Sequence, residues 1–183
     1  RMPDVSGMGR LIGTDASVPV AANYPAHPIT QRFTFLTAFP LARSVTPVSG
    51  GVNGHTAQAF VESSPRSWAE TDIKSLLTSG KVALDEDKGD KKGPIAIASA
   101  VSAASTAPPK PGEPADAPKP ETRVVVLGDS DFAATAGLGI QGNRDLFMNI
   151  VGWLSQQENL ISIRPKDADD RRITLTATQQ SNI

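Results

Sequence analysis

The sequence predicts one α/β domain, and three observations lead to that prediction. Its 183 residues match the usual size of a single domain. Residues 95–101 and 123–127 are apolar runs of the kind that forms buried strands. The second run is followed by a loop, an amphipathic helical pattern and a further strand-like segment, an order that is typical of α/β folds.

Composition narrows the functional classes. The 18 basic and 19 acidic side chains nearly cancel, so the chain has no basic excess for a nucleic acid and we expect none as a partner. Cysteine is absent, which excludes disulfides, thiolate nucleophiles and zinc sites that need sulfur. With 15 Gly, 15 Pro and 5% aromatic residues, the chain should be rich in loops around a small aliphatic core.

The first half of the chain predicts short elements. Residues 18–22 and 33–39 are the segments of the N-terminal region most expected to be ordered, and the second carries an apolar cluster that should pack on a sheet. Residues 58–61 predict a short strand, and one or two helical turns should follow Trp68 and end near Leu77.

A charged run precedes the first long strand. Residues 85–92 hold four acids and three bases around a glycine, which is typical of a solvated loop. Residues 95–101 carry no charge, so we expect a central strand covered on both faces.

Residues 102–122 form a Pro/Ala-rich stretch with six prolines and no large apolar side chain. Such a stretch cannot bury enough surface to offset its ordering entropy. Because strands are predicted on both sides of it, we interpret it as a flexible insertion within one domain that covers residues 1–183.

The second half predicts a strand at residues 123–127 and a helix capped by Asn143. Residues 160–163 and 172–176 predict two further short strands around a charged turn. The helix should bury one apolar stripe made by Leu146, Phe147, Ile150, Val151 and Leu154.

The loop after residues 123–127 reads GDSDF and holds the strongest candidates for chemistry. Open α/β sheets often place ligands at the carboxyl end of a buried strand. Asp129 and Asp131 could hold Mg²⁺, and Ser130 could be a nucleophile if a histidine lay beside it. In the third interpretation, which we favour, all three side chains hydrogen-bond loop amides.

Two residues downstream should support that loop. Asn143 and Arg144 begin the predicted helix, and we expect them to brace the loop at residues 129–131 by charge-assisted hydrogen bonds. The glycines Gly137, Gly139 and Gly142 match G-x-G-x-x-G, but the motif does not directly follow a strand. We interpret them as turn glycines and expect no cofactor.

The remaining candidates favour structural roles. His27 lies between two prolines and should fix a loop, and His55 should be exposed in a turn. Trp68 should bury its ring rather than stack on a ligand. A groove for a sugar or peptide near Trp68 and residues 33–39 is the alternative, and it requires an exposed ring.

Three stretches resemble a known family. Residues 18–43, residues 64–70 with the later Gly93 and Pro94, and above all residues 123–176 with their GDSDF and GNRDLF motifs are similar to the GldG-like, gliding-motility-type auxiliary proteins of ABC transporters. The resemblance implies a flavodoxin/Rossmann-like or glutamine-amidotransferase-like sheet with flanking helices, of which this chain holds only a part.

The same resemblance implies a function and a location. The protein would be a non-catalytic, membrane-anchored component on the extracytoplasmic or periplasmic face, with ABC permease and ATPase subunits as partners. Its membrane segments would lie outside the 183 residues, since no apolar run here approaches the ~20 residues of a span. No catalytic residue is carried over, and a metal-dependent or serine hydrolase centred on GDSDF is the alternative.

Overall fold

The structure is a computed structural model that describes residues 1–79, 81–106, 112 and 121–157. The elements are α1 (Met8–Leu11), β1 (Val20–Ala21), β2 (Thr37–Ala38), β3 (Gln58–Glu62), β4 (Trp68–Ala69), α2 (Ile73–Ser79), η1 (Glu86–Lys88), β5 (Lys91–Lys92), β6 (Ala96–Ala104), β7 (Glu121–Leu127), η2 (Asp131–Ala133), α3 (Thr135–Leu138) and α4 (Asn143–Leu154).

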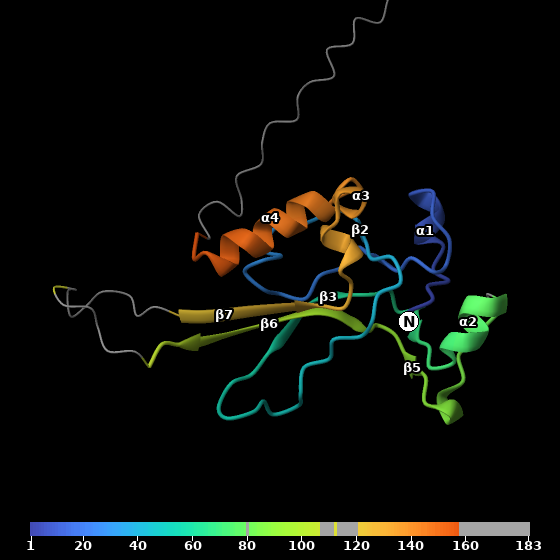
Figure 1. The fold of residues 1–183 in the computed structure, drawn as a ribbon, viewed down its shortest axis with the longest axis horizontal. Coiled ribbons are helices and arrows are strands. Elements are labelled where there is room, and N and C mark those ends of the chain that lie inside the picture. Colours follow the sequence, from blue (N-terminus) through green and yellow to red (C-terminus); the bar gives the residue numbers. More distant parts are fainter. Residues whose placement is uncertain (80, 107–111, 113–120, 158–183) are drawn as a thin grey trace, which may run out of the picture.

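A three-stranded sheet of order β3-β6-β7 forms the centre, and α4 lies across one of its faces (Figure 1). Two small antiparallel pairs, β1-β2 and β4-β5, flank it. This mixture of helices and sheets confirms the α/β prediction in its coarse form. All pairings between named strands in the described residues are antiparallel, so the parallel pairings of a flavodoxin-like sheet are not seen there.

The strands β6 and β7 border the stretch that the sequence identifies as an insertion. They pair antiparallel, with Ala98 opposite Leu127 and Ala104 opposite Glu121. The strands therefore extend into both ends of that stretch, and residues 107–111 and 113–120 lie outside the described part.

The predicted central strand is confirmed. β6 pairs on both sides, and residues 96–100 are buried as the absence of charge indicates. The expectation of a buried strand at residues 123–127 is wrong, because Val124 and Val126 are 46% and 49% exposed. β7 is the edge of the described sheet and only its other face, with Val125 and Leu127, packs against the core.

The helix α4 is confirmed, but its buried face differs from the predicted stripe. Leu146, Ile150 and Trp153 are buried, whereas Val151 and Leu154 are each 41% exposed. Trp153 was not part of the predicted stripe. The helix is rotated so that its tryptophan, rather than the neighbouring aliphatic residues, covers the sheet.

The core is more aromatic than the composition indicates. Phe39 stacks on Phe132 with ring centroids 5.1 Å apart. Phe60 and Trp153 join the same buried cluster. Five of the eight Phe and Trp side chains are buried, so the few aromatic residues are concentrated where they bury most area.

The short strands and the helix of the first half follow the predictions, but the apolar cluster at residues 33–39 is only partly buried, since Phe39 is buried and Phe35 is 37% exposed. Residues 18–22 and 33–39 contain the paired strands β1 and β2, with Val20 opposite Ala38. Residues 58–61 lie in β3, and α2 occupies the predicted helical position. The predicted strands at 160–163 and 172–176 lie outside the described residues. No helix in the described part is long and apolar enough to cross a membrane.

Candidate functional site

The loop after β7 begins between two backbone segments. The Gly128 N–H donates to the Ile97 carbonyl at 2.9 Å, and the Arg43 N–H donates to the Gly128 carbonyl at 2.8 Å. The first residue of the GDSDF motif is thus fixed between the central strand and the segment that follows β2. This placement decides where the two carboxylates can point.

Asp129 turns inward and organises the loop. Its side chain is 8% exposed, and its Oδ1 accepts the Asp131 N–H at 2.8 Å. Its Oδ2 is buried and has no hydrogen-bond partner in the described structure. Burial raises the pKa of Asp129 above its usual value. Ser130 and Asp131 are exposed.

A pocket of about 420 Å³ opens beside this loop. Residues 40–41 and 43–45 form one wall, residues 127–130 form another, and Arg1 lies at its rim. The Arg1 guanidinium donates to the Leu41 carbonyl. Arg1 and Arg43 supply two positive side chains, whereas Asp129 is the acid among the lining residues, so the pocket is basic in balance.

The geometry of the described residues supports neither the Mg²⁺ site at Asp129 and Asp131 nor the Ser130 nucleophile. In the described residues, no three Asp, Glu or His side chains are grouped as a metal site requires. Neither histidine lines the pocket that contains Ser130. The favoured interpretation, in which the loop side chains bind loop amides, holds for Asp129.

The histidines occupy structural positions. The His27 ring packs 5.4 Å from Phe60 and 5.2 Å from Trp153, measured between ring centroids. Its Nδ1 accepts the Ile29 N–H at 3.2 Å. Burial lowers the pKa of His27, which keeps the ring neutral. His55 is exposed in a turn, as predicted.

Asn143 and Arg144 do not brace the loop. The helix N-cap is Gly142, and Asn143 is the first helical residue. Its side chain is fully buried and binds Ala38 and Gly137 instead. Arg144 is exposed, and no hydrogen bond or ion pair joins it to Asp129 or Asp131 in the described structure. Both predicted bracing roles are wrong, because the Asn143 side chain binds the backbone of Ala38 and Gly137 and the Arg144 side chain is exposed.

Two of the three glycines serve close packing. A Cβ on Gly137 would lie 2.0 Å from the Asp131 carbonyl oxygen, and a Cβ on Gly142 would lie 2.4 Å from the Phe35 Cβ. A Cβ on Gly139 would lie 3.4 Å from its nearest neighbour, so that position is not crowded. Gly139 and Gly142 lie in turns, as predicted, whereas Gly137 lies in α3.

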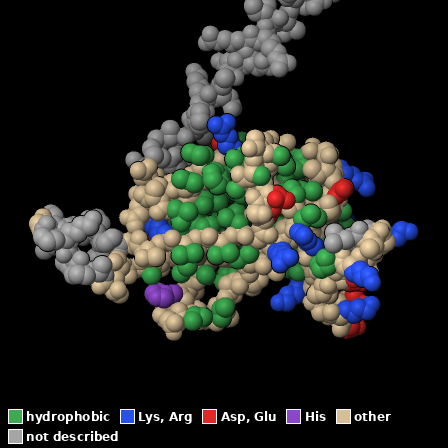
Figure 2. Space-filling model, viewed as in Figure 1, with side chains coloured by type: hydrophobic (Ala, Val, Ile, Leu, Met, Phe, Trp, Pro, Cys, Tyr) green, Lys and Arg blue, Asp and Glu red, His purple; other side chains and the backbone are tan. Residues whose placement is uncertain are grey.

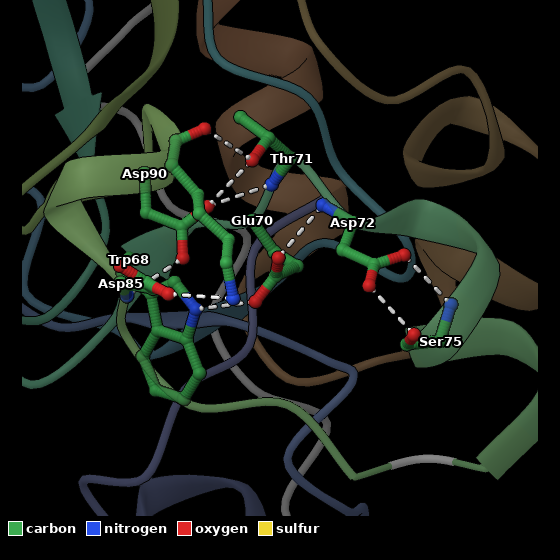
Figure 3. Close-up of polar contacts among 8 residues, drawn as sticks. Trp68, Glu70, Thr71, Asp72, Ser75, Asp85 and Asp90 are labelled. Carbon is green, nitrogen blue, oxygen red and sulfur yellow. Dashed lines mark hydrogen bonds and ion pairs between the residues drawn. The ribbon is translucent and has the colours of Figure 1, made fainter.

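Sequence reasoning missed a second polar cluster (Figure 3). The Trp68 indole N–H donates to Glu70 Oε2 at 2.9 Å, and Glu70 Oε1 accepts the Asp72 N–H at 2.8 Å. Asp90 accepts the Thr71 N–H at 2.9 Å through Oδ1. Trp68 is only 7% exposed, as predicted, which removes the aromatic platform that a sugar or peptide groove would need.

Asp90 shows why the charged run is not simply a solvated loop. It is 6% exposed, and besides the Thr71 N–H it accepts the Thr71 hydroxyl at 2.9 Å and the Asp85 N–H at 3.0 Å. The neighbouring Lys88 and Asp85 form an exposed ion pair at 2.8 Å. The carboxylates of this cluster already accept hydrogen bonds from protein donors. Their role is therefore to hold β4, α2 and η1 together.

We expect the variant Asp90→Asn to be less stable than the wild type at pH 7 and less sensitive to acid. Burial alone would raise the pKa of Asp90, but the hydrogen bonds from Asp85 and Thr71 outweigh it and hold this pKa below its usual 3.8. A lowered folded-state pKa contributes stability above pH 3.8 that is lost as the pH falls towards the folded-state value.

The measurement is urea unfolding of both proteins at pH 7 and at several values below pH 4. The stability difference should shrink as the pH falls. The surface variant Asp87→Asn is the control, since Asp87 is exposed in the same run. A difference that stays constant over this pH range would contradict the expectation.

Comparison with known proteins adds no relative: no family model, no curated protein and no solved structure matches the chain. The GldG-like resemblance therefore stays a prediction.

Proposed function

We propose that this chain is a non-catalytic, extracytoplasmic component of a GldG-like ABC-type transport system, and that it works by binding a protein or a ligand. The observation that supports the proposal is the state of the GDSDF loop. Asp129 is directed into the protein and accepts the amide of its own loop, while Ser130 lies at a pocket without a histidine. Such a loop shapes a surface, and among the described residues no histidine lines the pocket to act as a base for Ser130.

The pocket beside the loop is the proposed binding position. It is open, about 420 Å³ in size and lined by Arg1 and Arg43 together with the loop backbone. Guanidinium groups bind carboxylates well through paired hydrogen bonds. An acidic group on a permease subunit or on a small ligand would complement this surface.

The resemblance supports the rest of the proposal. The strands β3, β6 and β7 of the central sheet would belong to a larger flavodoxin-like or glutamine-amidotransferase-like sheet, completed by chain outside the described residues. Membrane anchoring would come from segments outside the 183 residues. ABC permease and ATPase subunits are the proposed partners.

The test is photo-cross-linking in the membrane-bound parent protein, co-expressed with the permease and ATPase subunits. A photoreactive amino acid at Ser44, on the pocket wall, should cross-link to the permease, detected with an antibody against that subunit. The same amino acid at Thr78, exposed on α2, is the matched control and should not. Equal cross-linking at both positions, or none at Ser44, would argue against the pocket as the binding position.

Hydrolase activity, the alternative, is tested on the same protein. We expect no turnover of p-nitrophenyl acetate or p-nitrophenyl phosphate, with or without Mg²⁺. Turnover that is lost in Ser130→Ala or Asp129→Asn would replace the proposal with an enzyme centred on this loop.

A further inference from the structure

The pocket beside the GDSDF loop is positive in balance. Arg1 and Arg43 line it, and Asp129 is the acid among the described lining residues. In the described part of the chain, neither guanidinium forms an ion pair with an acidic side chain. A ligand with one negative charge would balance these groups, whereas a second negative charge on the ligand would be repelled by Asp129.

The wall formed by residues 40–45 is apolar as well as basic. Pro40, Leu41 and Val45 line the pocket, and none of the three is fully buried. Figure 2 shows hydrophobic side chains next to basic ones in the region where Figure 1 marks the N-terminus. An apolar chain bound in the pocket would cover this surface and remove it from water.

Leu41 has an unusual backbone conformation. Its φ is +56°, in the left-handed region that residues other than glycine seldom adopt. Its N–H donates to the Ser17 carbonyl at 3.4 Å, and its carbonyl accepts the Arg1 guanidinium. Such conformations cost energy and occur preferentially at ligand sites. Here the conformation leaves a large apolar side chain 37% exposed at the wall of a basic pocket.

We propose that this pocket binds a monocarboxylate with a short apolar chain. The inference rests on the proposed function, in which the same pocket is the binding position, and it names the ligand class. The carboxylate pairs with Arg43 and Arg1, because guanidinium groups bind carboxylates through paired hydrogen bonds. The apolar chain packs on Leu41 and Val45, and the carboxylate of Asp129 excludes ligands with a second negative charge.

Three matched ligands test this class by NMR titration of the ¹⁵N-labelled 183-residue protein at pH 7 and constant ionic strength. Hexanoate should shift the backbone amides of residues 41–45 and 127–130 in a saturable way. Hexanamide lacks the charge and adipate adds a second one, so both should bind at least about tenfold more weakly. Asp129→Asn keeps an acceptor for the Asp131 N–H and should reduce the preference for hexanoate over adipate.

Variants of the apolar and basic wall give the second readout. Arg43→Gln should weaken hexanoate binding at least about tenfold, whereas Arg144→Gln, on exposed α4, should leave it unchanged. Leu41→Gly should also weaken binding, and it removes the side chain without disturbing the backbone, since glycine adopts a positive φ freely. Met148→Ala is its control, because Met148 is an exposed apolar residue away from the pocket.

A free acid and the last residue of a peptide both present this chemistry. N-acetylnorleucine is hexanoate with the amide of a peptide's last residue added. Tighter binding than hexanoate would assign the ligand to a peptide C-terminus, and equal or weaker binding would assign it to a free acid.

The proposal is overturned if hexanoate causes no saturable shift at the pocket. It is also overturned if adipate, hexanamide or the Arg43→Gln protein gives the same affinity as hexanoate with the wild type. The titration needs no permease, so its failure is distinct from a failure of cross-linking at Ser44, which tests the proposed partner.

Discussion

Replacing Asn143 by alanine is expected to lower the free energy of unfolding by about 4 kcal/mol. The Asn143 side chain is fully buried and makes three hydrogen bonds. Its Oδ1 accepts the Ala38 N–H at 2.9 Å, and its Nδ2 donates to the carbonyls of Ala38 and Gly137, each at 2.9 Å. The side-chain amide of Asn143 therefore makes the two backbone hydrogen bonds to Ala38 in β2 that a neighbouring strand would make. It also links β2 to α3 and α4.

The size of the effect follows from what the variant leaves behind. Alanine leaves one buried donor, the Ala38 N–H, and two buried acceptors, the Ala38 and Gly137 carbonyls, without the hydrogen bonds from residue 143. An unsatisfied buried polar group costs about 1 to 3 kcal/mol. Asn143→Asp should be similarly harmful, because a carboxylate cannot donate to either carbonyl. Urea unfolding followed by tryptophan fluorescence measures the change.

Arg144→Ala is the matched control, since Arg144 is the exposed neighbour on the same turn. Exposed substitutions of this kind usually stay within about 0.5 kcal/mol of the wild type. If Asn143→Ala were as stable as Arg144→Ala, the network around Asn143 would not contribute as its geometry indicates.

The hydrogen-bond partners of Asn143 could not be predicted from the sequence. The strand β6 and the helix α4 could be predicted because their patterns are local: an uncharged apolar run and a helical period. The partner of Asn143 lies 105 residues away along the chain, and no local pattern shows that distance. Its residue type fits a helix cap equally well, so the cap was the natural expectation.

The same limit explains the charged run and β7. Asp90 binds Thr71, 19 residues earlier, and no local pattern distinguishes it from the exposed acids beside it. A run of valines does not reveal which face of a strand will be covered. Val124 and Val126 lie on the face of β7 that is not packed against the core, whereas Val125 and Leu127 lie on the packed face.

The second large effect is expected from Gly128→Ala, which should cost about 3 kcal/mol of stability. A Cβ on Gly128 would lie 1.9 Å from the Arg43 carbonyl oxygen and 2.8 Å from the Arg43 carbonyl carbon. Both are backbone atoms, so no side chain can move aside to make room. The segment after β2 must shift, which breaks the 2.8 Å hydrogen bond from the Arg43 N–H to the Gly128 carbonyl.

The backbone conformation of Gly128 separates the two reasons that a glycine can be needed. Its φ is not positive, so alanine meets no conformational penalty and the cost is steric. Gly139→Ala is the control, because its Cβ would lie 3.4 Å from the nearest atom. Since residues 43–45 form a wall of the pocket at Asp129, Gly128→Ala should also reduce cross-linking from Ser44 to the permease, whereas Gly139→Ala should leave it unchanged. Equal unfolding midpoints in urea for the two variants would show that the close approach at Gly128 is not needed for the fold.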